Sequence, residues 1–437
     1  MLIDFSFSNY RSFKSEQSFS MARDSRFSEG RFGERSTVTA IYGPNASGKS
    51  NFLKALWTMA TLVRTSYSRG DVTTFIDREP FLLRNNAHGI ESMFYADFLA
   101  DDSQRYRYWF RCNDSLILHE ELSLFKTLGD RLSTHATKLF SRDGGEVSFG
   151  GSFRGPKAQV RKTVELRPNS LVLSASAAAG IKCTQAAYEF FSSSITYCDA
   201  LGFQGEQPLI IDEFNRSSGF SAHLQQLIRY ADFGIDSIRS VPVNADPVML
   251  DSFKEQLKSQ LGADSEKLDR LFNDSSAYEL RFVHNGEETV QFGVQNESRG
   301  TLAALSFFSL ALRQLARPTV TLVDEIDTSL HPALVREFIR LFTDPATNPH
   351  GSQIIFTTHD VSLITTSGAA ERLIDPDQVW LVEKTSEGDS ELYPVTDLKV
   401  RKEENIGRNY LNGIYGGVPR PSFHTAFTRI MEETDES

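Results

Sequence analysis

The sequence predicts an α/β fold with mixed and parallel sheets, an antiparallel β subregion and a helical insertion. A strand, a glycine-rich loop and a helix follow one another from residue 37, and two apolar strands in the last third of the chain end in polar side chains. This arrangement is typical of an open parallel sheet, which binds ligands at the carboxyl ends of its strands. Residues 91–125 alternate in three strand-length pieces, which predicts the antiparallel subregion.

The glycine-rich loop is predicted to bind phosphate. Residues 37–42, TVTAIY, predict a buried strand, and the residues after the loop carry apolar side chains at helical spacing. Between them, GPNASGKS fits the pattern G-x-x-x-x-G-K-[ST], with Gly43 and Gly48 as its glycines. Since such a loop turns backbone N–H groups toward anionic oxygens, we expect Lys49 to neutralise the β- and γ-phosphates of a nucleotide and Ser50 to bind Mg²⁺. A Gly/Ser loop with an isolated lysine is the alternative.

Two later strands carry polar residues at their ends. Residues 320–323 form an apolar strand that ends in Asp324 and Glu325, and residues 352–360 contain another that ends in His359. We expect Asp324 to hold the Mg²⁺ shell, Glu325 to polarise the attacking water, and His359 to contact the γ-phosphate or the water. Taken alone, such a histidine is more often structural. Its place as a third polar residue at a strand end favours a functional role.

The helix before the Asp-Glu strand begins at a polar turn. Ser298, Arg299, Gly300 and Thr301 open a helix whose apolar residues recur at helical spacing. A helix N-terminus of this composition can bind phosphate, yet the loop at 43–50 already serves the nucleotide of the chain itself. We therefore expect the turn to contact the nucleotide of a second subunit. An ordinary serine N-cap is the alternative.

Composition and charge restrict the class of protein. The net charge of −11 argues against a protein coated in nucleic acid, although a local basic groove can exist in an acidic chain. The sequence contains no run of eighteen apolar residues, so we expect no membrane segment. Three scattered cysteines without metal spacing predict free thiols in a reducing cytosol, and hence a cytoplasmic protein.

In their order and separation, the segments GPNASGKSN, ESRGT, LVDEID, LHP and TTHD resemble the ATP-binding cassette (ABC) ATPases of the SMC, RecF and Rad50 type. The chain is more similar still to the stand-alone AAA-type, ABC-like ATPases of bacterial abortive-infection and anti-phage operons. Its first strand, IDFSFSNYRSF, and its last segment, YLNGIYGGVPRPSF, also resemble that group. The resemblance implies an ABC-type head that forms a homodimer or a higher homo-oligomer around ATP, with Mg²⁺ as cofactor.

The resemblance also implies roles for individual residues. Lys49, Glu325 and His359 would be catalytic, and Ser50 and Asp324 would bind the metal. The nucleotide would be bound by the Walker A residues Gly43, Asn45, Gly48, Lys49, Ser50 and Asn51, by Arg11 of the first strand, by the signature residues Ser298 and Gly300, and by Asp327 of the D-loop. The chain departs from the pattern at Arg299, where an acidic residue is more usual, and by having no clear Q-loop glutamine in residues 80–99.

We expect residues 1–149 and 291–437 to form the ATPase head, interrupted by a mainly helical insertion at 150–290 that docks a dimer mate or an effector. Within it, residues 246–274 are predicted helical, and Asn-Gly between the alternating runs of 277–294 predicts a hairpin. Two functions stay open. The first is an ATPase that senses a phage protein and regulates a separately encoded toxin or nuclease, and the second is a DNA-repair or DNA-clamping ATPase of the RecF or Rad50 kind. The acidic charge and the missing coiled-coil arm favour the first.

Overall fold

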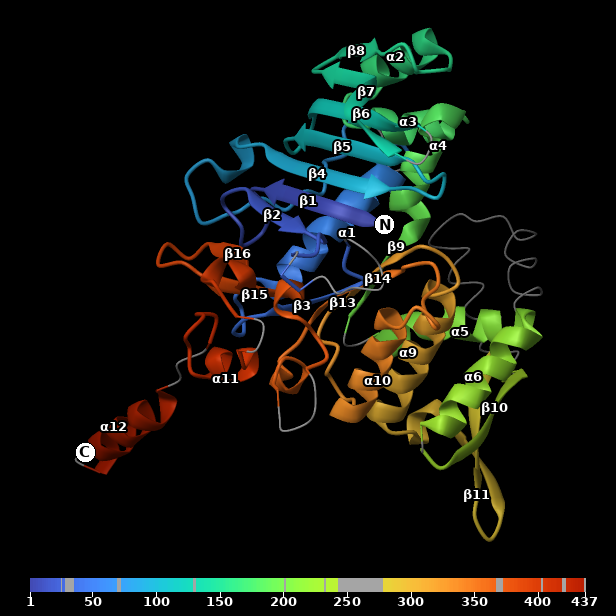
Figure 1. Ribbon diagram of the computed structural model, residues 1–437, viewed down its shortest axis with the longest axis vertical. Coiled ribbons are helices and arrows are strands. Elements are labelled where there is room, and N and C mark those ends of the chain that lie inside the picture. Colours follow the sequence, from blue (N-terminus) through green and yellow to red (C-terminus); the bar gives the residue numbers. More distant parts are fainter. Residues whose placement is uncertain are drawn as a thin grey trace, which may run out of the picture. The chain divides into compact units, whose positions relative to one another are not determined.

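The structure, a computed structural model, describes residues 1–24, 26–27, 35–68, 72–128, 131–199, 202–231, 233–242, 278–366, 372–401, 404–418 and 422–435. It divides the chain into two compact units, which are described separately (Figure 1). The first unit comprises Met1–Ala200, Gln314–Thr328 and Val335–Ser437, and the second comprises Leu201–Arg313 and Ser329–Leu334. Within the described ranges, no helix has both the length and the apolar character needed to cross a membrane.

A six-stranded sheet in the order β16-β15-β3-β14-β13-β9 carries the first unit. Its neighbours run parallel except for β15 and β16, which form an antiparallel pair. The three central strands are buried at every position, which is typical of a parallel sheet covered on both faces and confirms the predicted sheet. The strands are β3 (Val38–Tyr42), β9 (Ile195–Cys198), β13 (Val320–Val323), β14 (Gln353–Thr357), β15 (Val379–Lys384) and β16 (Ser390–Pro394).

The antiparallel subregion is a seven-stranded sheet in the order β2-β1-β4-β5-β6-β7-β8. Side chains of β5 alternate between buried and more exposed positions, as expected for a sheet with one face on the core. The predicted subregion is confirmed, because β4, β5 and β6 account for the three pieces in residues 91–125. The strands are β1 (Leu2–Ser8), β2 (Gln17–Ser20), β4 (Ser92–Leu99), β5 (Arg105–Cys112), β6 (Ile117–Leu128), β7 (Arg131–Asp143) and β8 (Glu146–Phe149).

One hydrophobic core joins both sheets of the first unit through helix α1 (Lys49–Thr65). Phe52 and Leu56 of α1 belong to the same buried cluster as Phe5 of the antiparallel sheet and Leu322 of the parallel sheet. This packing fixes the helix, and therefore the loop that leads into it. The C-terminal helices are α10 (Pro332–Thr343), α11 (Ile406–Leu411) and α12 (Phe423–Asp435).

Residues 150–200 belong to the first unit, whereas we expected an insertion to begin at 150. They form α2 (Lys157–Leu166), α3 (Val172–Ala178), α4 (Lys182–Glu189) and β9. The buried carboxylate of Glu120 in β6 accepts the N–H groups of Val172 and Leu173 at 2.6 and 2.9 Å, which ties the first turn of α3 to the antiparallel sheet. The apolar faces of these helices lie in the core of the first unit, and this is why the segment does not separate from it.

The second unit has a small core of its own, formed by helices and a three-stranded antiparallel sheet in the order β10-β11-β12. The predicted hairpin is confirmed by the pairing of β11 with β12. The helix predicted at 246–274 lies outside the described residues. The elements are α5 (Gly202–Arg216), α6 (Ser218–Tyr230), β10 (Ile235–Pro242), β11 (Tyr278–Asn285), β12 (Thr289–Gly293) and α9 (Arg299–Gln314).

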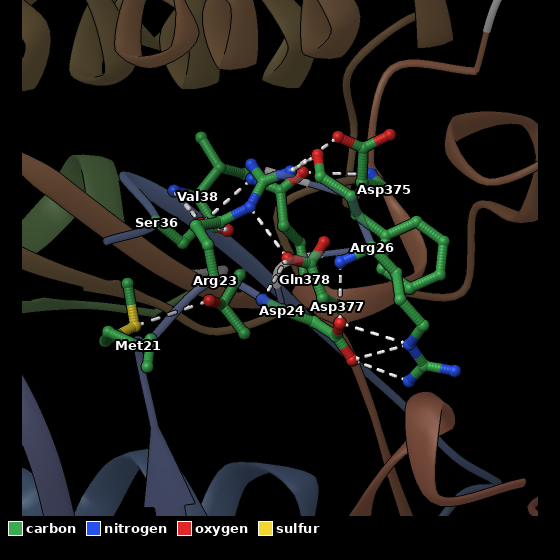
Figure 2. Close-up of polar contacts among 12 residues, drawn as sticks. Met21, Arg23, Asp24, Arg26, Ser36, Val38, Asp375, Asp377 and Gln378 are labelled. Carbon is green, nitrogen blue, oxygen red and sulfur yellow. Dashed lines mark hydrogen bonds and ion pairs between the residues drawn. The ribbon is translucent and has the colours of Figure 1, made fainter. Parts of the chain in front are cut away.

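A polar cluster holds the chain just before β3 (Figure 2). Arg23 forms ion pairs with Asp375 and Asp377, each at 2.7 Å. Gln378 donates a hydrogen bond at 2.8 Å to the hydroxyl of Ser36, two residues before β3. Since the two acids and Gln378 lie just before β15, the cluster fixes the start of β3 beside β15, and this places the loop at the other end of β3.

Candidate nucleotide-binding site

The loop between β3 and α1 has a backbone that requires glycine at two positions. Gly43 and Gly48 have φ angles of +154° and +117°. A Cβ atom on Gly43 would clash with the carbonyl oxygen of Val382, and one on Gly48 would lie 2.6 Å from the hydroxyl of Ser390. The left-handed backbone and the close approach of β15 and β16 therefore both exclude larger residues.

Lys49 folds back over this loop. Its Nζ donates hydrogen bonds to the carbonyl oxygens of Gly43 and Pro44 at 2.9 and 3.1 Å. Burial lowers the pKa of Lys49, and the negative charges of Glu325, Asp324 and Asp327 oppose this shift. Among the described residues, none caps the N-terminus of α1 with its side chain. The first N–H groups of α1 and the lysine ammonium can thus receive an anion, as a nucleotide phosphate would require.

Asp324, the residue after β13, accepts hydroxyl donors on both carboxylate oxygens. Ser50 and Thr357 donate to Oδ1 at 3.0 and 2.7 Å, and Tyr197 donates to Oδ2 at 3.2 Å. The Ser50 hydroxyl gives its one proton to Asp324, so its lone pairs can bind a cation. The described residues contain no cluster of three or more His, Cys, Asp or Glu suited to a metal, but Mg²⁺ bound with a nucleotide needs only one or two protein ligands. Ser50 and Asp324 fit that requirement.

Glu325 follows Asp324 in a left-handed backbone conformation, with φ of +52°. Its N–H donates to the Thr357 hydroxyl at 2.7 Å, and the Thr328 hydroxyl donates to its Oε2 at 3.3 Å. Such a conformation is unfavourable for a non-glycine residue and is often found at functional sites. Thr357 contacts both Asp324 and Glu325, and therefore orders the two acids relative to each other.

His359 lies at the end of β14, and its N–H donates to the carboxylate of Asp327 at 3.2 and 3.3 Å. Burial, followed by the positive charge of Lys49, lowers the pKa of His359, while Asp327 and Glu325 oppose the shift. The structure therefore brings together Lys49, Ser50, Asp324, Glu325, Asp327 and His359 at the carboxyl ends of β3, β13 and β14, the edge at which open parallel sheets bind ligands.

Arg11 and Asn51 meet beside the first turn of α1. An Nη atom of Arg11 donates to the Asn51 side chain at 3.4 Å, and another pairs with Glu79 at 2.6 Å. Asn51 in turn donates to the Ser12 hydroxyl at 2.9 Å. Asn45 is exposed on the loop between the two glycines. Arg11 is thus next to the predicted site, with a carboxylate as its present partner.

Ser298 and Gly300 lie in the second unit. The Ser298 hydroxyl accepts the N–H of Thr301 at 3.0 Å, so it caps the N-terminus of α9. A Cβ atom on Gly300 would lie 2.9 Å from the carbonyl oxygen of Ser329, which limits this position to glycine. The cap is the alternative that the sequence left open, and it does not prevent the exposed side of the turn from contacting phosphate.

The C-terminal segment that carries part of the family resemblance, which begins at Tyr410, lies against the glycine-rich loop between β3 and α1, called the phosphate loop from here on. The rings of Tyr42 and Tyr410 are 5.6 Å apart, and the Tyr410 hydroxyl donates to the carbonyl oxygen of Gly417 at 2.9 Å. The N–H of Gly417 donates to Glu383 of β15 at 3.0 Å. This packing supports the base of the loop, a role that the sequence pattern did not predict.

Tyr197 was missed by sequence reasoning, and so was the contact of Thr357 with both acids. Residues 80–99, where a Q-loop was sought, form a loop and β4 of the antiparallel sheet. β13 pairs with β14 on one side and with β9 on the other. β9 includes Tyr197 and lies in a segment that we expected to be helical. The β-branched and aromatic residues of its sequence, ITYC, were the available signal.

Comparison with known proteins gives a family match. A family described as "AAA domain, putative AbiEii toxin, Type IV TA system" has a model that matches residues 38–365. This range contains the phosphate loop, Asp324, Glu325 and His359, and the match confirms the resemblance to P-loop ATPases. No match was found among curated proteins.

Several solved structures are similar over most of the chain. An SMC head bound to the C-terminal winged-helix domain of ScpA has 13% identity and a TM-score of 0.43, covering 91% of this chain and 99% of that one. An SMC head with an extended coiled coil, bound to the C-terminal domain of ScpA derived from Pyrococcus furiosus, has 13% identity and a TM-score of 0.39, covering 91% and 97%. The recombination mediator RecF with ATPrS has 15% identity and a TM-score of 0.36, covering 90% and 98%.

Proposed function

We propose that the chain, which belongs to this AAA-domain family, hydrolyses ATP with Mg²⁺. Through this activity it would sense a phage component and regulate a separately encoded toxin or nuclease in bacterial anti-phage defence. One observation carries the ATPase part of the proposal. Lys49, Ser50 and Asp324 are held together by the phosphate loop and β13, with Glu325 next in the chain. The defence role is supported by the toxin–antitoxin wording of the family description.

The residues of the first unit suit in-line attack of water on the γ-phosphate. Lys49 would exchange its two carbonyl partners for phosphate oxygens. Ser50 and Asp324 would hold Mg²⁺, which neutralises charge on the β- and γ-phosphates. Glu325, whose backbone is fixed by Thr357, would accept the proton of the attacking water. His359, kept neutral by its lowered pKa, can donate one hydrogen bond and accept another at the γ-phosphate or the water.

A second copy of the chain is part of the proposal. Ser298 and Gly300 open α9 in the second unit, while the phosphate loop lies in the first. We place the α9 turn of one copy against the nucleotide of the other, so that ATP binding forms a homodimer or a higher homo-oligomer. Such an assembly couples nucleotide occupancy to the surface that an effector contacts.

The defence role can be tested by expressing the chain with its flanking genes and measuring survival after phage infection. We expect Asp324→Asn to abolish protection, because an amide is a poor magnesium ligand, and the exposed Asp397→Asn to leave protection intact. Protection that persists in Asp324→Asn would contradict a need for the ATPase site. Hydrolysis stimulated by DNA, without a response to infection, would contradict the defence role and favour the DNA-clamping alternative.

A further inference from the structure

Tyr197 belongs to β9, the edge strand that pairs in parallel with β13. The N–H of Asp324 donates to the carbonyl oxygen of Cys198 at 2.9 Å, which continues the pairing by one residue. The Tyr197 ring lies 6.0 Å from the ring of Trp57 on α1, at an interplanar angle of 30°. The strand pairing and this ring contact together fix where the Tyr197 hydroxyl lies.

The Tyr197 hydroxyl contacts the carboxylate oxygen of Asp324 that neither Ser50 nor Thr357 contacts. It donates to Oδ2 at 3.2 Å, while Ser50 and Thr357 both donate to Oδ1. The terminal torsion of an aspartate side chain is broad, so donors on a single oxygen restrict its rotation weakly. Donors on both oxygens define the plane of the carboxylate. A phenol has an ordinary pKa of about 10, so the Tyr197 hydroxyl carries a proton at neutral pH and donates it to the carboxylate.

We propose that Tyr197 is a positioning residue of the magnesium site, which holds the Asp324 carboxylate in the orientation that Ser50 and the metal require. This inference rests on the proposed ATPase function. Outer partners of metal ligands fix the ligand geometry, and their removal commonly costs about 10- to 100-fold in metal affinity. The ring and the hydroxyl can be separated experimentally, because the ring packs on Trp57 and lines a cavity of about 460 Å³, whereas the hydroxyl contacts Asp324.

The test uses Tyr197→Phe in the full-length protein. Tyr106→Phe is a matched control, because its hydroxyl also donates to an aspartate, Asp102, at 2.7 Å, but in the antiparallel sheet. Binding of Mn²⁺ in the presence of ATP is measured by electron paramagnetic resonance, which does not depend on turnover. Hydrolysis is then measured against Mg²⁺ concentration. We expect Tyr197→Phe to weaken Mn²⁺ binding and to raise the half-saturating Mg²⁺ concentration about tenfold, with most of kcat recovered at saturating Mg²⁺.

A role in packing alone would lower the melting temperature and leave the Mg²⁺ dependence unchanged. Unchanged Mn²⁺ binding and Mg²⁺ dependence in Tyr197→Phe, with normal hydrolysis by the wild type, would overturn the positioning role. An equal change in Tyr106→Phe would overturn it as well, since the effect would then not be specific to Asp324. Wild-type protein that neither binds nor hydrolyses ATP would instead overturn the proposed function.

Discussion

The N-termini of α1 and α9 were both predicted to face phosphate, but they differ in whether a side chain caps the first turn. No described side chain caps α1, which begins after a left-handed glycine and has Lys49 folded back over the preceding loop, onto the carbonyl oxygens of Gly43 and Pro44. In contrast, the first turn of α9 is capped by Ser298, which accepts the N–H of Thr301. The end of α1 therefore has donors and a cation that a phosphate can satisfy. At α9, Ser298 already satisfies the N–H of Thr301, and the role of the rest of this helix end depends on what a second copy presents.

The largest expected effect is at the uncapped helix. Lys49→Ala should weaken ATP binding by about a hundredfold or more, since a hydrogen bond to a charged group contributes roughly 1.5–3 kcal/mol and this ammonium can make more than one. Isothermal calorimetry with ATP measures it, with the exposed Lys162→Ala as the control. Undiminished affinity in Lys49→Ala would remove the phosphate-loop assignment.

The second largest effect is expected in Glu325→Gln, which should separate ATP binding from ATP turnover. Glu325→Gln should keep ATP binding and lose hydrolysis by about 10²- to 10⁴-fold, because the amide is nearly isosteric but cannot accept the proton of water. Single-turnover and steady-state assays of this variant, beside the exposed Glu337→Gln, provide the measurement. If the steady-state rate stays near the wild-type value, the general base is another residue, and His359 is the next candidate.

The capped helix can be tested with two substitutions at one position. Ser298→Asp keeps a side chain that can cap α9 but adds a negative charge, whereas Ser298→Ala removes the cap at a cost of about 1 kcal/mol of stability. If α9 meets the phosphate of a partner, Ser298→Asp should lose hydrolysis while its melting temperature stays close to the wild-type value.

Mixing two inactive variants sharpens this comparison. A mixture of Lys49→Ala and Ser298→Asp should recover part of the ATPase activity, because one of the two sites in a mixed dimer combines an intact loop with an intact α9. Activity is measured against mixing ratio. A linear loss without recovery would argue against composite sites, and full activity of Ser298→Asp alone would assign Ser298 to helix capping only.

The smallest expected effect is a pH dependence of stability. Burial and the charge of Lys49 lower the pKa of His359 from the ordinary value of 6.5, so just below pH 6.5 the unfolded chain binds more protons than the folded one. Stability from this group is therefore present above pH 6.5 and is lost as the pH falls through that value. Lowering the pH from about 7.5 to about 5.5 should reduce the melting temperature of His359→Gln by less than that of the wild type. Identical losses would show that His359 does not titrate as described.

The parts of the site that sequence could predict are those carried by short local patterns. The phosphate loop, Asp324, Glu325 and His359 each follow a recognisable apolar strand, and the structure brings them to one edge of the sheet. Tyr197 could not be found in this way, because its contact with Asp324 depends on which strand pairs with β13, more than a hundred residues away. β9 has only four residues, too few for a period to distinguish a strand from a helix. The predicted bounds at 150 and 290 differ from the structural units for a related reason: sequence shows that α2–α4 are helices, but not which core they join.

The order of strands around β3 has a consequence for synthesis of the chain. β3 ends at residue 42, but its partners β14 and β15 begin at residues 353 and 379. At about 5–20 residues per second, a ribosome needs on the order of 15–60 s to reach β14, and during this time both edges of β3 lack their native partners. We expect nascent chains stalled before residue 353 to be sensitive to protease and unable to bind ATP, and to depend on chaperones for solubility. The cradle for the nucleotide is encoded by residues next to β3 but can assemble only after β14 and β15 have been synthesised.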